Sequence, residues 1–219
     1  MKRIVLLLSV MVLLMLAACT PKVTTSGLVD RMTHDPNATN TETILHVWSW
    51  NFPTITENMK QIADAGFTMI QTSPVNACFS PEGGNIKILD EKEGNWYHYY
   101  QPTDWKIGNY QLGTREEFIR LCDKADALGI KVIVDVAPNH TTTTTEAISQ
   151  DLLDAVGGIE NLYHTNGMES IKDYKDREEC TLMVVGGLPD VNTEIPAFQD
   201  YFIAFLNDCI ACGADGFRY

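Results

Sequence analysis

The sequence predicts an α/β fold, because strand-like and helix-like segments alternate along most of the chain. Two further observations favour this class. The run KVIVDV, residues 131–136, is apolar on both faces, as a parallel strand covered by helices should be. Two long segments, residues 75–113 and 141–192, follow the C-terminal ends of predicted strands, where such folds place their sites. A doubly wound sheet and a (β/α)8 barrel both fit the pattern.

The first strand–helix–strand unit begins at residue 44. ILHVWSW, residues 44–50, is β-branched and aromatic, which predicts a strand. Residues 54–66 show a helical apolar face, and Thr54 with Glu57 predicts a capping box at its start. FTMIQTSP, residues 67–74, predicts the second strand.

The second half repeats the pattern. Residues 114–130 predict a helix that begins with a capping box of Thr114 and Glu117, followed by the third strand. Residues 195–213 predict another helix, with a proline near its start. ADGFRY, residues 214–219, predicts the fourth strand.

The N-terminal residues predict export rather than fold. Residues 1–18 contain Lys2 and Arg3, a short apolar run and then small residues, as in a secretory signal peptide. LAAC resembles the lipobox of bacterial lipoproteins, so we expect cleavage before Cys19 and lipidation of its sulfur, with a plain signal peptide as the alternative. Residues 19–43 are polar and aperiodic, which predicts a flexible tether. We therefore expect a secreted lipoprotein anchored to the bacterial cell membrane.

The charge and the cysteines narrow the classes of partner and chemistry. A net charge of −13 over 219 residues repels phosphate backbones, so we expect no nucleic acid and favour a neutral partner such as a sugar. Besides Cys19, the remaining cysteines of the six are odd in number and cannot all pair. Cys209 and Cys212 form a C-x-x-C pattern on an apolar helix face, which favours buried packing over redox or metal chemistry.

Polar residues gather where the third strand ends, in VDVAPNH. Asp135 stands inside an apolar run, where a carboxylate is costly unless it is hydrogen-bonded. Asn139 and His140 follow at the C-terminal edge of the strand. Each alone fits a capped strand end, but together they predict a site.

Three other segments leave two interpretations open. Residues 95–109 are rich in aromatic rings, which suit the apolar faces of sugars but also a small local core. In GLPDVN, Asn192 or the following threonine is expected to cap a helix, which leaves Asp190 free for a hard cation with oxygen ligands. Arg218 near the end of the fourth strand suits a structural ion pair or a site.

Taken together and in order, these segments resemble the α-amylase family of glycoside hydrolases. DVAPNH, GADGFRY, LPDVN and YYQPTDWKIGN each resemble a motif of that family, and ILHVWSWNF and QTSP resemble its first two strands. The resemblance implies a (β/α)8 TIM barrel with a domain inserted after strand three. It also implies a calcium-dependent retaining endo-hydrolase of α-1,4-glucosidic bonds in starch and related α-glucans, expected to act as a monomer.

The resemblance also implies roles for individual residues. Calcium ligands are implied at Asn139, Asp190 and the carbonyl of Thr181. Substrate contacts are implied at Trp96, Tyr97, Tyr100, Gln101 and His140, with the ring of Tyr100 under the sugar at the cleavage point. Asp135 is implied to support its strand end, and Arg218 to orient and ionise the nucleophile.

The resemblance divides the chain into barrel residues 44–140, an inserted calcium-binding domain at 141–191 and barrel residues 192–219. The family places its nucleophile two residues after the arginine, which is the position after Tyr219. We therefore expect a sequence truncated after strand four, without nucleophile or acid/base and inactive by itself. A lipid-anchored α-glucan-binding protein without catalysis is the alternative, because fold alone does not settle function.

Overall fold

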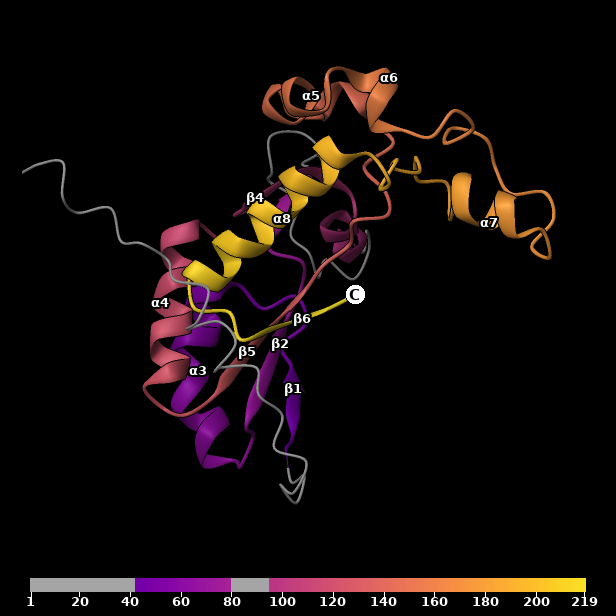
Figure 1. Ribbon diagram of the computed structural model, residues 1–219. Coiled ribbons are helices and arrows are strands. Elements are labelled where there is room, and N and C mark those ends of the chain that lie inside the picture. Colours follow the sequence, from indigo (N-terminus) through magenta and orange to yellow (C-terminus); the bar gives the residue numbers. More distant parts are fainter. Residues whose placement is uncertain (1–41, 80–94) are drawn as a thin grey trace, which may run out of the picture. The chain divides into compact units, whose positions relative to one another are not determined.

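The computed structural model describes residues 42–79 and 95–219, which lie in a compact unit that begins at Asn40. A four-stranded parallel sheet forms its centre, with strand order β1-β2-β5-β6 (Figure 1). The sheet consists of β1 (Ile44–His46), β2 (Met69–Thr72), β5 (Lys131–Asp135) and β6 (Gly216–Arg218). All four predicted strands are present and parallel, which confirms the α/β class, although β1 is shorter than predicted.

The pairing of the last two strands positions the site. In the register of β5 with β6, Asp135 lies opposite Arg218. Parallel strands carry their C-terminal ends to one edge of the sheet, so these two residues and the turn that follows β1 lie at the same edge.

Three long helices pack with the sheet: α3 (Phe52–Asp64), α4 (Arg115–Asp126) and α8 (Pro196–Ala211). Figure 1 shows α3 and α4 side by side, and Phe52 of α3 stacks at a tilt on Phe118 of α4, with ring centroids 5.3 Å apart. Each helix buries one apolar stripe, as amphipathic helices on a sheet do. The core therefore lies between these helices and the strands.

Of the caps predicted for the N-termini of α3, α4 and α8, one is correct and two are wrong. The capping box of Thr114 and Glu117 is present at the start of α4. The one predicted at Thr54 is wrong, because the side chain of Asn51 caps α3 by accepting a 2.8 Å hydrogen bond from the Thr54 N–H. The predicted cap of α8 at residue 192 or 193 is also wrong. Ile195 occupies the N-cap position and makes no side-chain hydrogen bond. Pro196 follows at N1, and because proline has no N–H, this position leaves no donor unsatisfied.

Residues 75–113, for which no strand or helix was predicted, contain regular structure. Strands β3 (Asn76–Cys78) and β4 (Pro102–Ile107) pair antiparallel, and a 3-10 helix, η2 (Asn95–Tyr100), directly precedes β4. The sheet edge is thus covered by a small folded unit that delivers the aromatic residues of η2.

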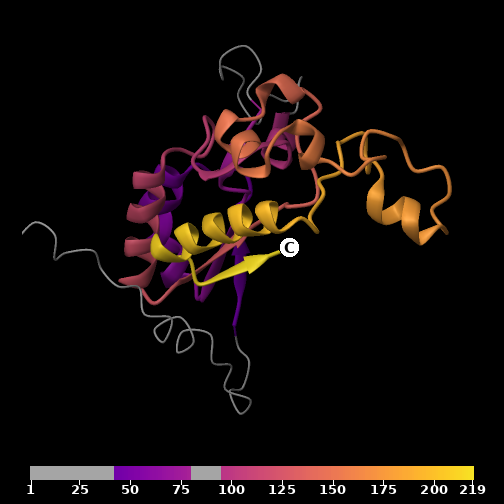
Figure 2. The same ribbon diagram turned by 45° about the horizontal axis from the view of Figure 1, so that its top comes forward.

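Residues 141–191 form a set of short helices: η3 (Thr145–Ala147), α5 (Gln150–Val156), α6 (Ile159–Leu162) and α7 (Arg177–Leu182). Figure 2 shows α5 and α6 beside the N-terminal end of α8, and α5 contacts both α6 and α8. Both ends of the segment meet beside β5, where isolated bridges join His140 to Asp190 and Tyr163 to Val191.

The described part of the chain also answers the expectation about the cysteines. Cys209 and Cys212 are free and buried, and burial raises the pKa of the Cys212 thiol to about 11. Both thiols stay protonated at neutral pH, which favours the packing interpretation. Within residues 42–79 and 95–219, no helix is both long and apolar enough to cross a bilayer.

Candidate active site

The centre of the site is Asp135, whose side chain is only 1% exposed at the end of β5. Arg218 Nη1 donates hydrogen bonds of 2.9 Å and 3.0 Å to its two carboxylate oxygens. The Tyr100 hydroxyl donates a third, of 2.7 Å, to Oδ2. These bonds offset the desolvation of the carboxylate, so the predicted support role of Asp135 has a physical basis in this network.

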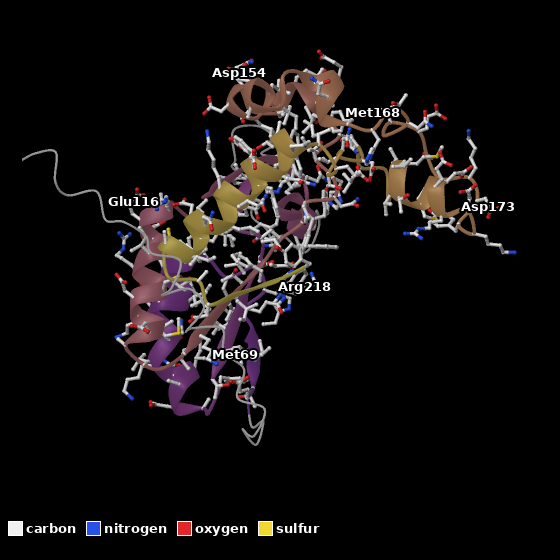
Figure 3. The ribbon with its side chains drawn as sticks, viewed as in Figure 1. Met69, Glu116, Asp154, Met168, Asp173 and Arg218 are labelled. Atoms are coloured by element: carbon white, nitrogen blue, oxygen red, sulfur yellow. The ribbon has the colours of Figure 1, made fainter. Side chains whose placement is uncertain are left out.

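Charge and protonation are well defined around Asp135. The Asp135 carboxylate raises the pKa of Arg218, so the guanidinium is permanently charged. Burial, and secondly the bond to Asp135, raises the pKa of the Tyr100 phenol well above its usual range, so this hydroxyl remains a donor. Figure 3 shows Arg218 at the end of β6, and its side chain is 55% exposed. The arginine therefore offers positive charge to the solvent side of the sheet edge.

The aromatic residues of the 95–109 segment divide into two groups. Tyr99 and Trp105 are fully buried, and Trp105 packs edge-on against Phe198 of α8, with centroids 4.9 Å apart. Trp96 and Tyr97 are 43% and 41% exposed, with centroids 6.1 Å apart. The local core that the sequence left open is therefore present at the first pair, whereas the second pair forms an exposed aromatic surface, for which sugar contact stays a prediction.

Two further residues predicted to contact the substrate, His140 and Gln101, make hydrogen bonds beside Tyr100. His140 Nε2 donates a 2.9 Å hydrogen bond to the carbonyl of Tyr100, and burial lowers the pKa of His140 so that it is neutral at pH 7. The side-chain oxygen of Gln101 accepts a long hydrogen bond of 3.4 Å from the Thr142 hydroxyl. The structure thus ties η2 to the segment that leaves β5, and Tyr100 is held from both its hydroxyl and its backbone.

A second buried carboxylate, Asp190, lies next to Asn139. The Asn139 amide is 3.3 Å from Asp190 Oδ1, and His164 Nδ1 is 2.6 Å from Oδ2. The other nitrogen of His164, Nε2, is 2.6 Å from Glu194 Oε2. Burial raises the pKa of Asp190, while the bonds to its carboxylate act in the opposite direction. His164 and Glu194 were not predicted as site residues, and no local pattern links a histidine to an acid 26 residues away.

Thr181, the remaining implied metal ligand, lies in α7. Its hydroxyl donates to the carbonyls of Arg177 and Glu178, and no hydrogen bond between described residues joins it to Asn139 or Asp190. Within the described ranges, no group of three or more His, Cys, Asp and Glu side chains has the arrangement of a metal site. The structure brings together two of the three implied ligands, and Thr181 stays a prediction.

Comparison with known proteins identifies the family. The model of the α-amylase catalytic domain matches residues 51–219. The chain belongs to this family. It is 54% identical over 175 residues to an α-amylase of Butyrivibrio fibrisolvens, which covers 80% of the chain and 18% of that protein. It is 35% identical over 187 residues to an α-amylase of Clostridium acetobutylicum, which covers 84% of the chain and 23% of that protein. The chain therefore spans about a fifth of the length of these relatives.

Solved α-amylase structures show the fold. α-Amylase I of Eisenia fetida matches with a TM-score of 0.64 at 21% identity, over 81% of this chain and 37% of that one. An α-amylase of Geobacillus thermoleovorans, complexed with acarbose, matches with a TM-score of 0.62 at 21% identity, over 81% and 39% of the two chains. The predicted (β/α)8 TIM-barrel class is confirmed, and the sheet β1-β2-β5-β6 corresponds to part of such a barrel.

Proposed function

We propose that the protein, expressed from its complete reading frame, hydrolyses α-1,4-glucosidic bonds in starch and related α-glucans by retaining double displacement. The observation that carries the proposal is the network of Asp135, Arg218 and Tyr100 at the C-terminal edge of the sheet. Membership of the α-amylase family supports it. So does the naming of a maltohexaose complex for the Eisenia fetida enzyme and an acarbose complex for the Geobacillus enzyme.

In this proposal Tyr100 supplies the surface on which a glucosyl ring stacks. Its ring is held in place by the hydrogen bond from its hydroxyl to Asp135 and by the bond that its backbone carbonyl accepts from His140. The side chain therefore loses little conformational freedom when a sugar binds. Trp96 meets Tyr100 edge to face, with centroids 6.3 Å apart, and extends the aromatic surface outward. A neutral sugar suits aromatic faces flanked by hydrogen-bonding groups.

The charged residues divide the chemical work. Retaining hydrolysis needs two carboxyl groups about 5–5.5 Å apart, one of which attacks the sugar. Asp135 is buried and both of its oxygens are bonded, so we assign it the positioning of Arg218 and Tyr100 and not the attack. Arg218 keeps positive charge at the exposed edge, where it lowers the pKa of a neighbouring carboxylate and keeps a nucleophile ionised.

We further propose that Asn139 and Asp190 hold a calcium ion. Amide and carboxylate oxygens are the hard ligands that Ca²⁺ prefers. The Asn139 amide nitrogen donates to Asp190 Oδ1 at 3.3 Å, so a flip of the amide would place its oxygen beside the carboxylate. A divalent cation would offset the desolvation that raises the pKa of Asp190. Bound calcium would supply structural stabilisation there, joining the end of β5 to the end of the 141–191 segment.

Two variants of Tyr100 test the proposed function on soluble starch. Tyr100→Ala removes the ring, and we expect kcat/KM to fall by about 100-fold, as for loss of a contact that orients the reacting sugar. Tyr100→Phe keeps the ring and loses one hydrogen bond to a charged group, worth about 1.5–3 kcal/mol. We expect it to retain more activity than Tyr100→Ala. Starch binding without release of reducing ends by the wild type would instead favour the glucan-binding alternative.

The site of attachment is a separate proposal. We propose that Cys19, which lies outside the described residues, is lipidated and anchors the protein to the bacterial membrane. Mass spectrometry of the mature N-terminus from a bacterial host should find a diacylglyceryl-cysteine. A mature protein with an unmodified N-terminus would contradict it.

A further inference from the structure

The turn between β1 and α3 presents two tryptophans at the same sheet edge as Asp135. Trp48 and Trp50 are each 38% exposed, which is high for the largest apolar side chain. Between them, Ser49 has a φ of +63°, and among the described residues it is the one non-glycine with positive φ. Such a conformation costs about 1–3 kcal/mol and persists only where its surroundings hold it.

The surroundings of Ser49 are built to hold the turn. The Ser49 N–H donates a 2.9 Å hydrogen bond to the buried Ser73 hydroxyl at the end of β2. The Trp50 N–H donates 3.2 Å to the Val47 carbonyl and closes the turn. Val47 and Ser49 are buried whereas Trp48 between them is exposed, so the turn directs Trp48 outward. The turn therefore keeps a large aromatic ring at the surface in a fixed position.

Trp48 packs against the aromatic surface already described. Its ring centroid lies 5.5 Å from that of Trp96, with the planes tilted by 56°. Trp96 in turn contacts Tyr100, whose hydroxyl bonds to Asp135. A continuous row of rings thus runs from the end of β1 to the buried carboxylate. Trp48 and Trp96, the two rings farthest from that carboxylate, are both partly exposed.

We propose that Trp48 is a further glucan-contacting residue, which together with Trp96 forms a stacking position for a glucosyl ring beyond the one over Tyr100. The inference rests on the proposed function and adds a determinant of preferred chain length. A ring needed only for packing would be buried, whereas the strained turn keeps Trp48 partly exposed to solvent. Two tilted, partly exposed indoles offer the apolar faces that a glucosyl ring stacks on.

The test compares a short and a long substrate, in the protein expressed from its complete reading frame. Trp48→Ala should lower kcat/KM for maltoheptaose by about 5- to 10-fold, the upper part of the range for one aromatic contact. It should leave maltose within about 2-fold, because a disaccharide that spans the cleavage point does not reach this position. Trp50→Ala is the matched control, because Trp50 is equally exposed but makes none of the ring contacts found among the described residues. It should leave both substrates within about 2-fold.

Two further variants separate stacking from folding. Trp48→Phe and Trp48→Leu both keep apolar bulk in the turn, but only phenylalanine keeps an aromatic face. Phenylalanine should retain more of the maltoheptaose rate than leucine at equal melting temperature. Equal rates for Trp48→Ala and wild type on maltoheptaose, or equal losses on both substrates, would overturn the inference alone. A wild type that turns over neither substrate would overturn the proposed function and the inference with it.

Discussion

Asp135 and Asp190 are both buried acids, with exposed fractions of 1% and 3%. Asp135 ends β5, and Asp190 lies near the end of the 141–191 segment. The groups that bind the two carboxylates differ in kind. Asp135 faces a permanent cation, Arg218, and a tyrosine that donates to it. Asp190 faces the amide of Asn139 and the imidazole of His164, which is charged only when protonated. The first cluster therefore contains a permanent positive charge and the second does not. Our proposals assign the first cluster to the sugar and the second to calcium.

Removal of Arg218 should have the largest effect of the substitutions in these two clusters. Arg218→Ala leaves a buried carboxylate without its cation, and we expect the free energy of unfolding to fall by about 2 kcal/mol. This is less than for a fully buried pair, because Arg218 is half exposed. If Arg218 keeps the nucleophile ionised as we propose, starch hydrolysis should fall by at least about 100-fold.

Urea unfolding and release of reducing ends measure the two effects. Arg218→Lys is the control, since it keeps the charge but not the planar guanidinium, and it should restore stability more than activity. Equal urea midpoints for Arg218→Ala and wild type would show that Asp135 does not depend on this cation.

The stability conferred by the Asp190 cluster should depend on bound calcium and not on a permanently charged side chain. A ligand that binds the native state at 100 times its Kd stabilises it by about 2.7 kcal/mol. Asp190→Asn should lower calcium affinity by at least about 10-fold and abolish most of that gain, because a charged ligand is lost. Melting curves with excess calcium and with a chelator measure it. Asp154→Asn, an exposed acid of α5 labelled in Figure 3, should keep the calcium response of the wild type.

The smallest effect concerns acid stability and His140, which touches both clusters. Burial lowers its pKa, and the hydrogen bond to the Tyr100 carbonyl and then the charge of Asp190 oppose this more weakly. As pH falls through the ordinary histidine pKa of about 6.5, the unfolded chain takes up a proton before the folded one, so stability is lost. His140→Gln removes this loss, and its free energy of unfolding should fall less between about pH 8 and pH 5. Parallel pH profiles for the two proteins would contradict a neutral, buried His140.

The sequence predicts these two clusters unequally. Asp135, Tyr100 and Arg218 follow from strand ends and from ordered motifs, because parallel strands bring their C-terminal ends together. Asn139 was expected at a polar strand end and Asp190 to be free for a hard cation, but their pairing as calcium ligands was anticipated only through the family resemblance, as was the stacking role of Tyr100. His164 and Glu194 escaped prediction because the contacts of His164 with Asp190 and with Glu194 depend on how the 141–191 segment folds back, which no periodicity encodes.

Fold prediction depended on both local and long-range signals. The capping box predicted for α4 is correct, whereas the equally local one predicted for α3 is wrong. The strand β1 stops at His46, earlier than its composition suggests, because Ser49 takes a left-handed conformation held by Ser73 of another strand end. The pair β3–β4 was missed because its partners, such as Asn76 and Ile107, are far apart in sequence.

The most direct test of the central proposal is a crystal structure of the protein from its complete reading frame with acarbose. We expect one ring of the ligand to stack on Tyr100, beside the Asp135–Arg218 pair, with further rings against the exposed aromatic residues. Acarbose bound at another edge of the barrel, with Tyr100 free of ligand, would contradict the assignment of this network to the sugar site.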